Sequence, residues 1–298
     1  MGDITLRQAL EEYKTIFMAS RNLADRTRVE YLNDLQDLIA FLEQLRLNEV
    51  NNIGLPQLER YLAELDNRGI AGSTRKRKVV SIRSFLWYLF QERYIGTNLA
   101  KRLIPPFSEA SSPRYLTKSE YERLLKESSN NPRDHALMQL LLQTGIKLSE
   151  FTRLTIQDIE LPSDIFPDMK EVGYLYVGGS KSKKGRVIPL NAKACISLAN
   201  YFNGQNMMQS TALFTSRFGK SLSARGVEKI VRKYMLRTNI RDASVQSLRH
   251  TFGIHHINSG ADLKMIKEVM GYRDSRAVSI YNAIVKNRIG TELQEHAL

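Results

Sequence analysis

The chain has 298 residues, of which 42% are hydrophobic and 25% are charged, so it is long enough to bury two domain cores. Its formal net charge of +13 predicts attraction to polyanions, with nucleic acid ahead of an anionic membrane. No apolar run approaches the roughly 20 residues of a membrane span, and the first residues lack the features of a signal peptide, which predicts a soluble cytoplasmic protein. The single Cys195 cannot form an internal disulfide, and we expect it to be a small core residue.

Residues 1–104 carry the apolar spacing of α-helices. Apolar side chains recur with a helical period in three stretches, 6–17, 31–42 and 79–89. The last stretch follows the densest basic cluster of the chain, Arg75-Lys76-Arg77-Lys78, and includes Arg83. We predict an all-α domain in which this helix buries one side and presents Arg75, Lys78 and Arg83 to the DNA backbone or major groove. A solvated run of charges is the alternative interpretation.

The helical periodicity breaks between Lys101 and Pro113. This stretch holds three prolines and three serines, which disfavour a helix and favour an extended chain. It predicts an interdomain linker over residues 105–114 and a second domain over residues 115–298.

The second domain combines helical patterns with one predicted hairpin. Thr117-Lys118-Ser119-Glu120 is a capping box that opens a helix, and Gly145 is placed to end a later helical pattern. Two β-prone stretches, 174–177 and 186–188, flank a turn rich in glycine, serine and lysine. The predicted fold is therefore mainly α with a small β-sheet: an N-terminal all-α domain and a C-terminal mixed α/β domain.

Two side chains of the second domain have the chemistry that phosphodiester cleavage needs. Arg249 carries a planar cation that can bind two phosphate oxygens at any working pH. Tyr281, 32 residues later, carries a phenol that needs cationic neighbours to act as a nucleophile, because its ordinary pKa is about 10. Taken alone, Tyr281 would be interpreted as a packing residue, and its spacing from Arg249 and Gly271 reverses that interpretation. Tyr272 is a rival phenol.

Four motifs, in their order and spacing, resemble those of the tyrosine recombinases, the phage-integrase and Xer family. They are Gln143–Glu150, Gly179–Leu190, Ser247–Phe252, and Met270–Tyr272 followed after nine residues by Tyr281. The resemblance covers nearly the whole chain and implies a core-binding, SAM-like N-terminal domain and a C-terminal catalytic domain that form a C-shaped clamp around duplex DNA. It also implies a 3′-phosphotyrosine at Tyr281, a phosphate clamp at Arg249, and protonation of the leaving 5′-oxygen by Lys181.

Three positions depart from the family pattern. Lys147 stands where the family usually has its first catalytic arginine, Gln246 where it has a histidine, and Tyr272 where it has histidine or tryptophan. An ammonium lacks the bidentate geometry of a guanidinium, so we expect Lys147 to be a poorer clamp. Gln246 can hydrogen-bond a phosphate oxygen but cannot exchange a proton, so we expect a neutral orienting group.

Other residues of these motifs have supporting roles by the same resemblance. Glu150 is expected to buttress the cations of the active site, and His250 to lie in a second layer or in the core. The remaining cations of the third motif compete with Lys181 for its role or contact the DNA backbone; they are Lys183, Lys184 and Arg186. We expect no metal site, because no histidine, carboxylate and cysteine set has metal-ligand spacing. The resemblance also implies strand exchange without a metal, a nucleotide or another cofactor.

The resemblance implies a site-specific DNA recombinase whose partner is a double-stranded recombination site. Four protomers would exchange strands through a Holliday junction, and an apolar tail after Tyr281 would dock on a neighbouring subunit or pack on its own chain. Integration, transposon resolution and chromosome-dimer resolution all remain open as its role. The alternatives are a DNA-binding protein of the same fold that has lost the chemistry, and a nicking enzyme similar to type IB topoisomerases.

Overall fold

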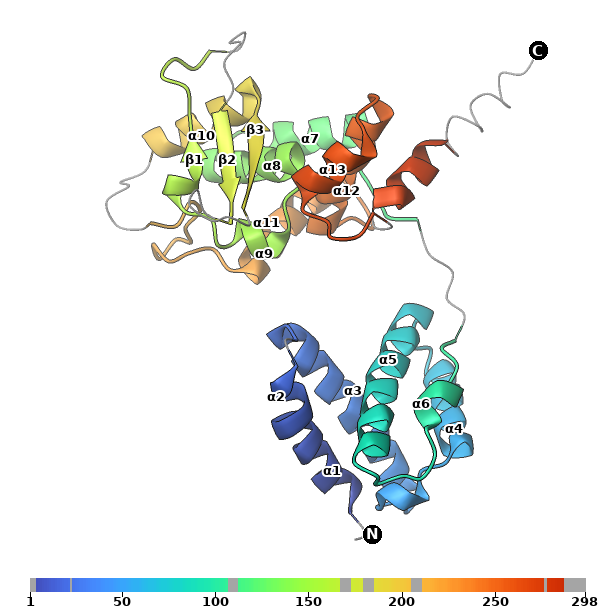
Figure 1. Ribbon diagram of the computed structural model, residues 1–298. Helices are drawn as coiled ribbons and strands as arrows, with labels where there is room; N and C mark the ends of the chain where they lie inside the picture. Colours follow the sequence, from blue (N-terminus) through green and yellow to red (C-terminus); the bar gives the residue numbers. More distant parts are fainter. Residues whose placement is uncertain are drawn as a thin grey trace, which may run out of the picture. The chain divides into compact units, whose positions relative to one another are not determined.

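The computed structural model describes residues 4–21, 23–106, 112–166, 173–178, 185–204, 211–275 and 278–286. The chain divides into two compact units, Met1–Ser111 and Ser112–Leu298 (Figure 1). The division falls inside the stretch predicted to be a linker. Within the described residues, no helix combines the length and the apolar character that crossing a membrane requires.

The first unit is all-α, as its periodicity predicts. Its helices are α1 (Leu6–Glu12), a π-helical turn (Tyr13–Phe17), α2 (Met18–Ser20), α3 (Asp25–Gln44), a 3-10 turn (Val50–Asn52), α4 (Leu55–Asn67), α5 (Gly72–Gln91) and α6 (Leu99–Arg102). The long helix α5 contacts α3, α4 and α6, and its apolar face lies in the core of the unit. The buried residues Val79, Ile82 and Leu86 belong to the face predicted from the sequence.

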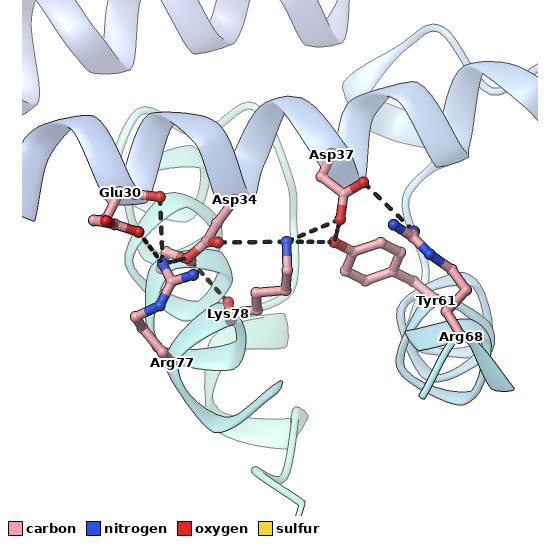
Figure 2. A network of polar contacts seen from close by, with 8 residues as sticks. Glu30, Asp34, Asp37, Tyr61, Arg68, Arg77 and Lys78 are labelled. Carbon is pink, nitrogen blue, oxygen red and sulfur yellow. Dashed lines mark hydrogen bonds and ion pairs between the residues drawn. The ribbon is translucent and has the colours of Figure 1, made fainter. Parts of the chain in front are cut away.

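A buried ion-pair network joins α5 to α3 and α4 (Figure 2). Lys78 Nζ donates to Asp37 Oδ2 at 2.8 Å and lies 3.4 Å from Asp34 Oδ1. Tyr61 Oη donates to the same Asp37 oxygen at 2.8 Å. Asp34 is 2% exposed and also accepts hydrogen bonds from Arg77 and from Ser81. The charges that this network buries inside the unit are paired with one another, because burying an unpaired charge costs a large free energy.

The structure corrects the expectation that α5 presents Lys78 to DNA. Lys78 lies one residue before the buried Val79, its side chain points into the unit, and it is 8% exposed, because two carboxylates of α3 neutralise it there. Arg75 pairs with Asp66 at 2.8 Å, and Arg83 Nε donates to the Ala100 carbonyl at 2.8 Å. Lys76 is the exposed member of the cluster.

The second unit is a mixed α/β fold. Its elements are α7 (Lys118–Ser128), α8 (Pro132–Thr144), α9 (Leu148–Phe151), a 3-10 turn (Ile156–Asp158), β1 (Ile159–Glu160), β2 (Gly173–Val177), β3 (Arg186–Leu190), α10 (Ala192–Asn203), α11 (Ala224–Arg237), α12 (Val245–Asn258), α13 (Leu263–Met270) and a helix over 278–286. The sheet, α8 and α10 lie beside one another in Figure 1, and α8 is central because it also contacts α7 and α12. Cys195 is fully buried in this core, as predicted.

The predicted hairpin is confirmed by β2 and β3, which pair antiparallel with Leu175 opposite Ile188. Alternate residues of the two strands point into the core, as in a sheet with one buried face. The two-residue strand β1 pairs with the other edge of β2 and was not predicted, since two residues are too short to show a strand period. β3 also contacts α13, which brings the hairpin next to the helices that carry the candidate site.

Helix ends bring the motifs of the second unit together. Thr117 and Glu120 form the predicted capping box at the start of α7. Gly145 ends α8 in the left-handed conformation, with φ of 56°. A Cβ at this position would lie 2.5 Å from the ring of Phe252, so a glycine allows α8 to end directly against α12.

Candidate active site

Arg249 lies at the centre of the site, on the buried face of α12. It is 3% exposed, and each guanidinium nitrogen donates to an oxygen of the second unit. Nη1 donates to the Gly145 carbonyl, Nη2 to the Met270 carbonyl at 2.8 Å, and Nε to the Tyr272 hydroxyl at 3.3 Å. The ends of α8 and α13 therefore fix the guanidinium through their last free carbonyls, which a helix cannot satisfy by itself.

A guanidinium has five N–H hydrogens, and these contacts use three of them. One hydrogen remains on each of Nη1 and Nη2, and these two nitrogens form the fork that matches two oxygens of a phosphate. The guanidinium carbon also lies 4.4 Å from the centre of the Tyr272 ring, so the phenol covers one face of the cation. Arg249 is thus held rigidly and keeps the hydrogens for a bidentate anion contact.

A second cationic group lies around Glu150. Lys147 caps α9, and its Nζ donates to the Gly271 carbonyl at 2.8 Å and lies 3.9 Å from Glu150 Oε1. Arg186, from β3, donates to both Glu150 oxygens at 3.0 and 2.7 Å, and its Nε donates to the Val269 carbonyl at 2.6 Å. Burial alone would raise the pKa of Glu150, and the hydrogen bonds from Arg186 and from the Lys147 backbone lower the pKa below its usual value.

Gly271 makes this close approach possible. It ends α13 in the left-handed conformation with φ of 65°, and a Cβ there would lie 2.7 Å from Arg186 Nη1. The glycine of the Met270-Gly271-Tyr272 motif thus serves two purposes. It permits the turn that places Tyr272 over Arg249, and it leaves room for a guanidinium from the hairpin.

Tyr281 lies on the helix 278–286 and is completely buried. Its ring packs in a small cluster with residues of α12 and α13, among them Phe252 and Met270. A Cβ added to Gly253 would lie 2.7 Å from the ring, so α12 has a glycine where Tyr281 presses against it. The ring is thereby positioned by packing, and its hydroxyl is left to polar neighbours.

Two polar groups hold the Tyr281 hydroxyl. The Tyr272 hydroxyl lies 2.9 Å from Tyr281 Oη, and His250 Nδ1 lies 2.9 Å from the same oxygen. Burial raises the pKa of Tyr281 well above that of a free phenol, although Arg249 opposes the shift. Burial and then the charge of Arg249 lower the pKa of His250. At neutral pH the site therefore contains a protonated phenol beside a neutral imidazole.

The structure brings six of the residues singled out from the sequence into one place: Lys147, Glu150, Arg249, His250, Tyr272 and Tyr281. Gln246 lies one helical turn before His250 on α12 and is exposed. The predicted Lys181, Lys183 and Lys184 lie outside the described residues, as do residues 287–298, which include most of the predicted apolar tail. Arg186, predicted as a DNA contact, binds Glu150 instead of facing solvent, being 20% exposed.

Sequence reasoning missed the contact between His250 and Tyr281. The two residues are 31 positions apart on different helices, and no spacing rule joins them. The sequence contains only an indirect signal that His250 lies in the site. His250 directly follows Arg249 and lies four residues after Gln246, so it shares a helical face with a candidate phosphate contact.

Comparisons with known proteins agree on one family. The model of the phage integrase family matches residues 114–288, and that of the SAM-like N-terminal domain of phage integrases matches residues 10–93. The tyrosine recombinase XerC of Pelotomaculum thermopropionicum is 28% identical over 300 residues, covering 94% of this chain and 94% of its own. The tyrosine recombinase XerD of Staphylococcus epidermidis is 28% identical over 290 residues, covering 94% of this chain and 95% of its own.

Solved structures share the fold. XerH recombinase bound to a palindromic difH substrate in a post-cleavage complex matches with a TM-score of 0.76 and 19% identity, over 96% of this chain and 84% of that one. A lambda integrase dimer bound to a COC′ core site matches with a TM-score of 0.73 and 17% identity, over 94% of this chain and 77% of that one. The chain therefore belongs to the phage integrase family and is a tyrosine recombinase, an enzyme that transfers DNA strands in site-specific recombination.

Proposed function

We propose that the chain cleaves one DNA strand by attack of Tyr281 Oη on the scissile phosphorus. The attack forms a bond from phosphorus to Tyr281 and breaks the bond from phosphorus to the 5′-oxygen, which leaves a 3′-phosphotyrosine and a 5′-hydroxyl. The observation that carries this proposal is the continuous contact from Arg249 through the Tyr272 hydroxyl to Tyr281 Oη. It joins a candidate phosphate clamp to a candidate nucleophile.

Arg249 is proposed to hold the scissile phosphate through its two remaining hydrogens. Lys147 is proposed as the second cation, because its side chain is 44% exposed and its ammonium group spends one of its three hydrogens on the Gly271 carbonyl. Lys181 remains the proposed acid for the leaving 5′-oxygen, and Gln246 a proposed neutral contact to phosphate. Positive charge held in place before the reaction stabilises a phosphoryl transition state more than the ground state.

The arrangement fits a resting state of the enzyme. Tyr281 is fully buried, and Tyr272 covers one face of Arg249. The Tyr281 hydroxyl therefore has to move before it can reach a phosphate that is bound to Arg249. We propose that DNA binding shifts the helix 278–286, which carries Tyr281, toward the phosphate held by Arg249. α12, which carries Arg249 and His250, would stay in place because α8, α11 and α13 pack on it.

The duplex DNA partner is proposed to contact both units. In the first unit, Lys76 is the exposed cation of the basic cluster, while Arg75, Arg77 and Arg83 have protein partners they can share with phosphate. In the second unit, Lys183 and Lys184 remain proposed backbone contacts. Such contacts make binding depend strongly on salt, because each cation placed on a phosphate releases a counterion.

Assembly and location are part of the same proposal. Lambda integrase, which shares the fold, forms a dimer on a core site in one solved structure and a tetramer on a Holliday junction in another. We propose that this chain also works as a tetramer on two recombination sites in the cytoplasm, with its C-terminal tail on a neighbouring subunit.

One experiment identifies the DNA site and tests the proposed reaction together. The full chain is incubated with sheared DNA of its source cell, the mixture is denatured, and fragments that remain bound to protein are sequenced. A single recovered sequence motif gives the site, and a duplex of that site with a nick beside the scissile bond then serves as a suicide substrate. Protein-linked DNA from the wild type and none from Tyr281→Phe supports the proposal, whereas equal yields from both contradict it.

A further inference from the structure

The hydroxyl of Tyr281 has two hydrogen-bonding neighbours, the Tyr272 hydroxyl and His250 Nδ1. Arg249 Nε can only donate, so the Tyr272 oxygen accepts from it. The Tyr272 and Tyr281 oxygens lie 2.9 Å apart and either can donate, while His250 Nδ1, 2.9 Å from Tyr281 Oη, accepts from it in the tautomer that carries its proton on Nε2. When Tyr281 donates to His250, the Tyr272 hydrogen is the one that points to Tyr281 Oη, and each hydroxyl then donates one hydrogen bond and accepts one.

A nucleophilic phenol must lose its proton, and few groups near Tyr281 can take it. Arg249 is always charged, and the Tyr272 hydroxyl is a neutral phenol, so neither accepts a proton at neutral pH. Glu150 is bound on both oxygens by Arg186. Among the residues that the structure describes, the group that both touches Tyr281 Oη and can accept its proton is the His250 imidazole.

We propose that His250 is the catalytic residue that accepts the proton of Tyr281, with Tyr272 as the donor that stabilises the phenolate. This inference rests on the proposed function of Tyr281. In the step, the O–H bond of Tyr281 breaks and its proton moves to His250 Nδ1, while Oη bonds to phosphorus and the bond from phosphorus to the 5′-oxygen breaks. Lys181 supplies the proton of the 5′-hydroxyl, and the reverse transfers accompany rejoining, so no other reactant is needed.

The placement of His250 on α12 suits this role. His250 directly follows Arg249 on a helix that three other helices pack against, so the phosphate clamp and the proton acceptor keep a fixed separation. The phenol moves between them when the helix 278–286 shifts. Burial and the charge of Arg249, which lower the pKa of His250, keep the imidazole neutral and ready to accept a proton.

The test compares two variants on the suicide substrate in single-turnover cleavage. His250→Ala removes the acceptor, while His250→Asn places an amide oxygen near the position of Nδ1 and keeps a hydrogen bond without proton transfer. If His250 is the proton acceptor, both variants cleave about 100 to 10,000 times more slowly than the wild type. If His250 only positions Tyr281, the Asn variant cleaves like the wild type, and this result overturns the proposal.

A second substrate separates proton acceptance from proton donation. It carries sulfur in place of the bridging 5′-oxygen, so its leaving group departs without a proton. Lys181→Ala should regain activity on it, whereas both His250 variants should stay slow, and recovery of the His250 variants would overturn the assignment. DNA binding by His250→Asn, measured without cleavage, verifies folding. Absence of any adduct with the wild-type protein would instead reject the proposed function itself, on which the inference depends.

Discussion

Replacing Lys147 by arginine should accelerate strand cleavage. Lys147 Nζ donates one hydrogen to the Gly271 carbonyl, which leaves two hydrogens on a point charge for phosphate. A guanidinium making the same backbone contact would keep four hydrogens in a plane, two of them able to face one phosphate. The Glu150 carboxylate would compete little with phosphate for the new guanidinium at position 147, because both of its oxygens already accept hydrogen bonds from Arg186.

The expected gain follows from the number of added donors. One preorganised donor on a developing oxyanion contributes about 3 to 4 kcal/mol, which corresponds to a rate increase on the order of a hundredfold to a thousandfold. DNA affinity should hardly change, because the charge at position 147 is the same and the extra contact strengthens only as charge builds up in the transition state.

Single-turnover cleavage of the nicked site by the wild type, Lys147→Arg and Lys147→Met measures this effect. The Met variant is the matched control that keeps the length of the side chain and removes its charge, and it should cleave more slowly than the wild type. Equal or slower cleavage by the Arg variant, with a slow Met variant, would refute the reasoning. The site would then be built around an ammonium at position 147, with Gln246 and Tyr272 adapted to it.

Three further predictions concern stability. Lys78→Met should destabilise the first unit by about 1 to 3 kcal/mol, because Asp34 and Asp37 keep other partners but lose a buried cation. Urea unfolding, followed by the fluorescence of Trp87, the single tryptophan, measures this change. Burial alone would raise the pKa of Asp37, yet Lys78 and Tyr61 lower the pKa on balance. The contribution of Asp37 to the free energy of unfolding is therefore complete above its unfolded pKa of about 4 and is lost as the pH falls through its lower folded pKa. The difference in the free energy of unfolding between wild type and Lys78→Met should narrow in acid, and a constant difference down to the acid transition would refute this. Gly253→Ala should destabilise the second unit by about 1 to 3 kcal/mol through overpacking against Tyr281, lowering the thermal midpoint seen by circular dichroism while the Trp87 transition stays unchanged.

Local sequence patterns predicted much of the fold because the residues involved are close in sequence. Helical periodicity identified the buried face of α5, and a capping box and a glycine marked where α7 begins and α8 ends. The β2 and β3 pair followed from two β-prone stretches around a turn. These features depend on neighbours within about one or two helical turns, which a single sequence displays directly.

Contacts between distant residues could not be predicted in this way. The burial of Lys78 depends on Asp34 and Asp37, more than 40 residues earlier, and a basic cluster shows no sign of such partners. Arg186 could equally have faced DNA, and its choice of Glu150 depends on the turn at Gly271. The motifs singled out Arg249 and Tyr281 as candidates, but they did not predict that packing buries the phenol in the free protein.

The most direct test of the proposed mechanism is the identity of the residue that becomes linked to DNA. The wild-type chain is trapped on the suicide substrate, digested with a protease, and the peptide that carries the nucleotide is located by mass spectrometry. We expect the link at Tyr281, with adduct formation abolished in Tyr281→Phe and only slowed in Tyr272→Phe. A link at Tyr272, or an adduct that persists in Tyr281→Phe, would contradict the assignment of the nucleophile and with it the proposed mechanism.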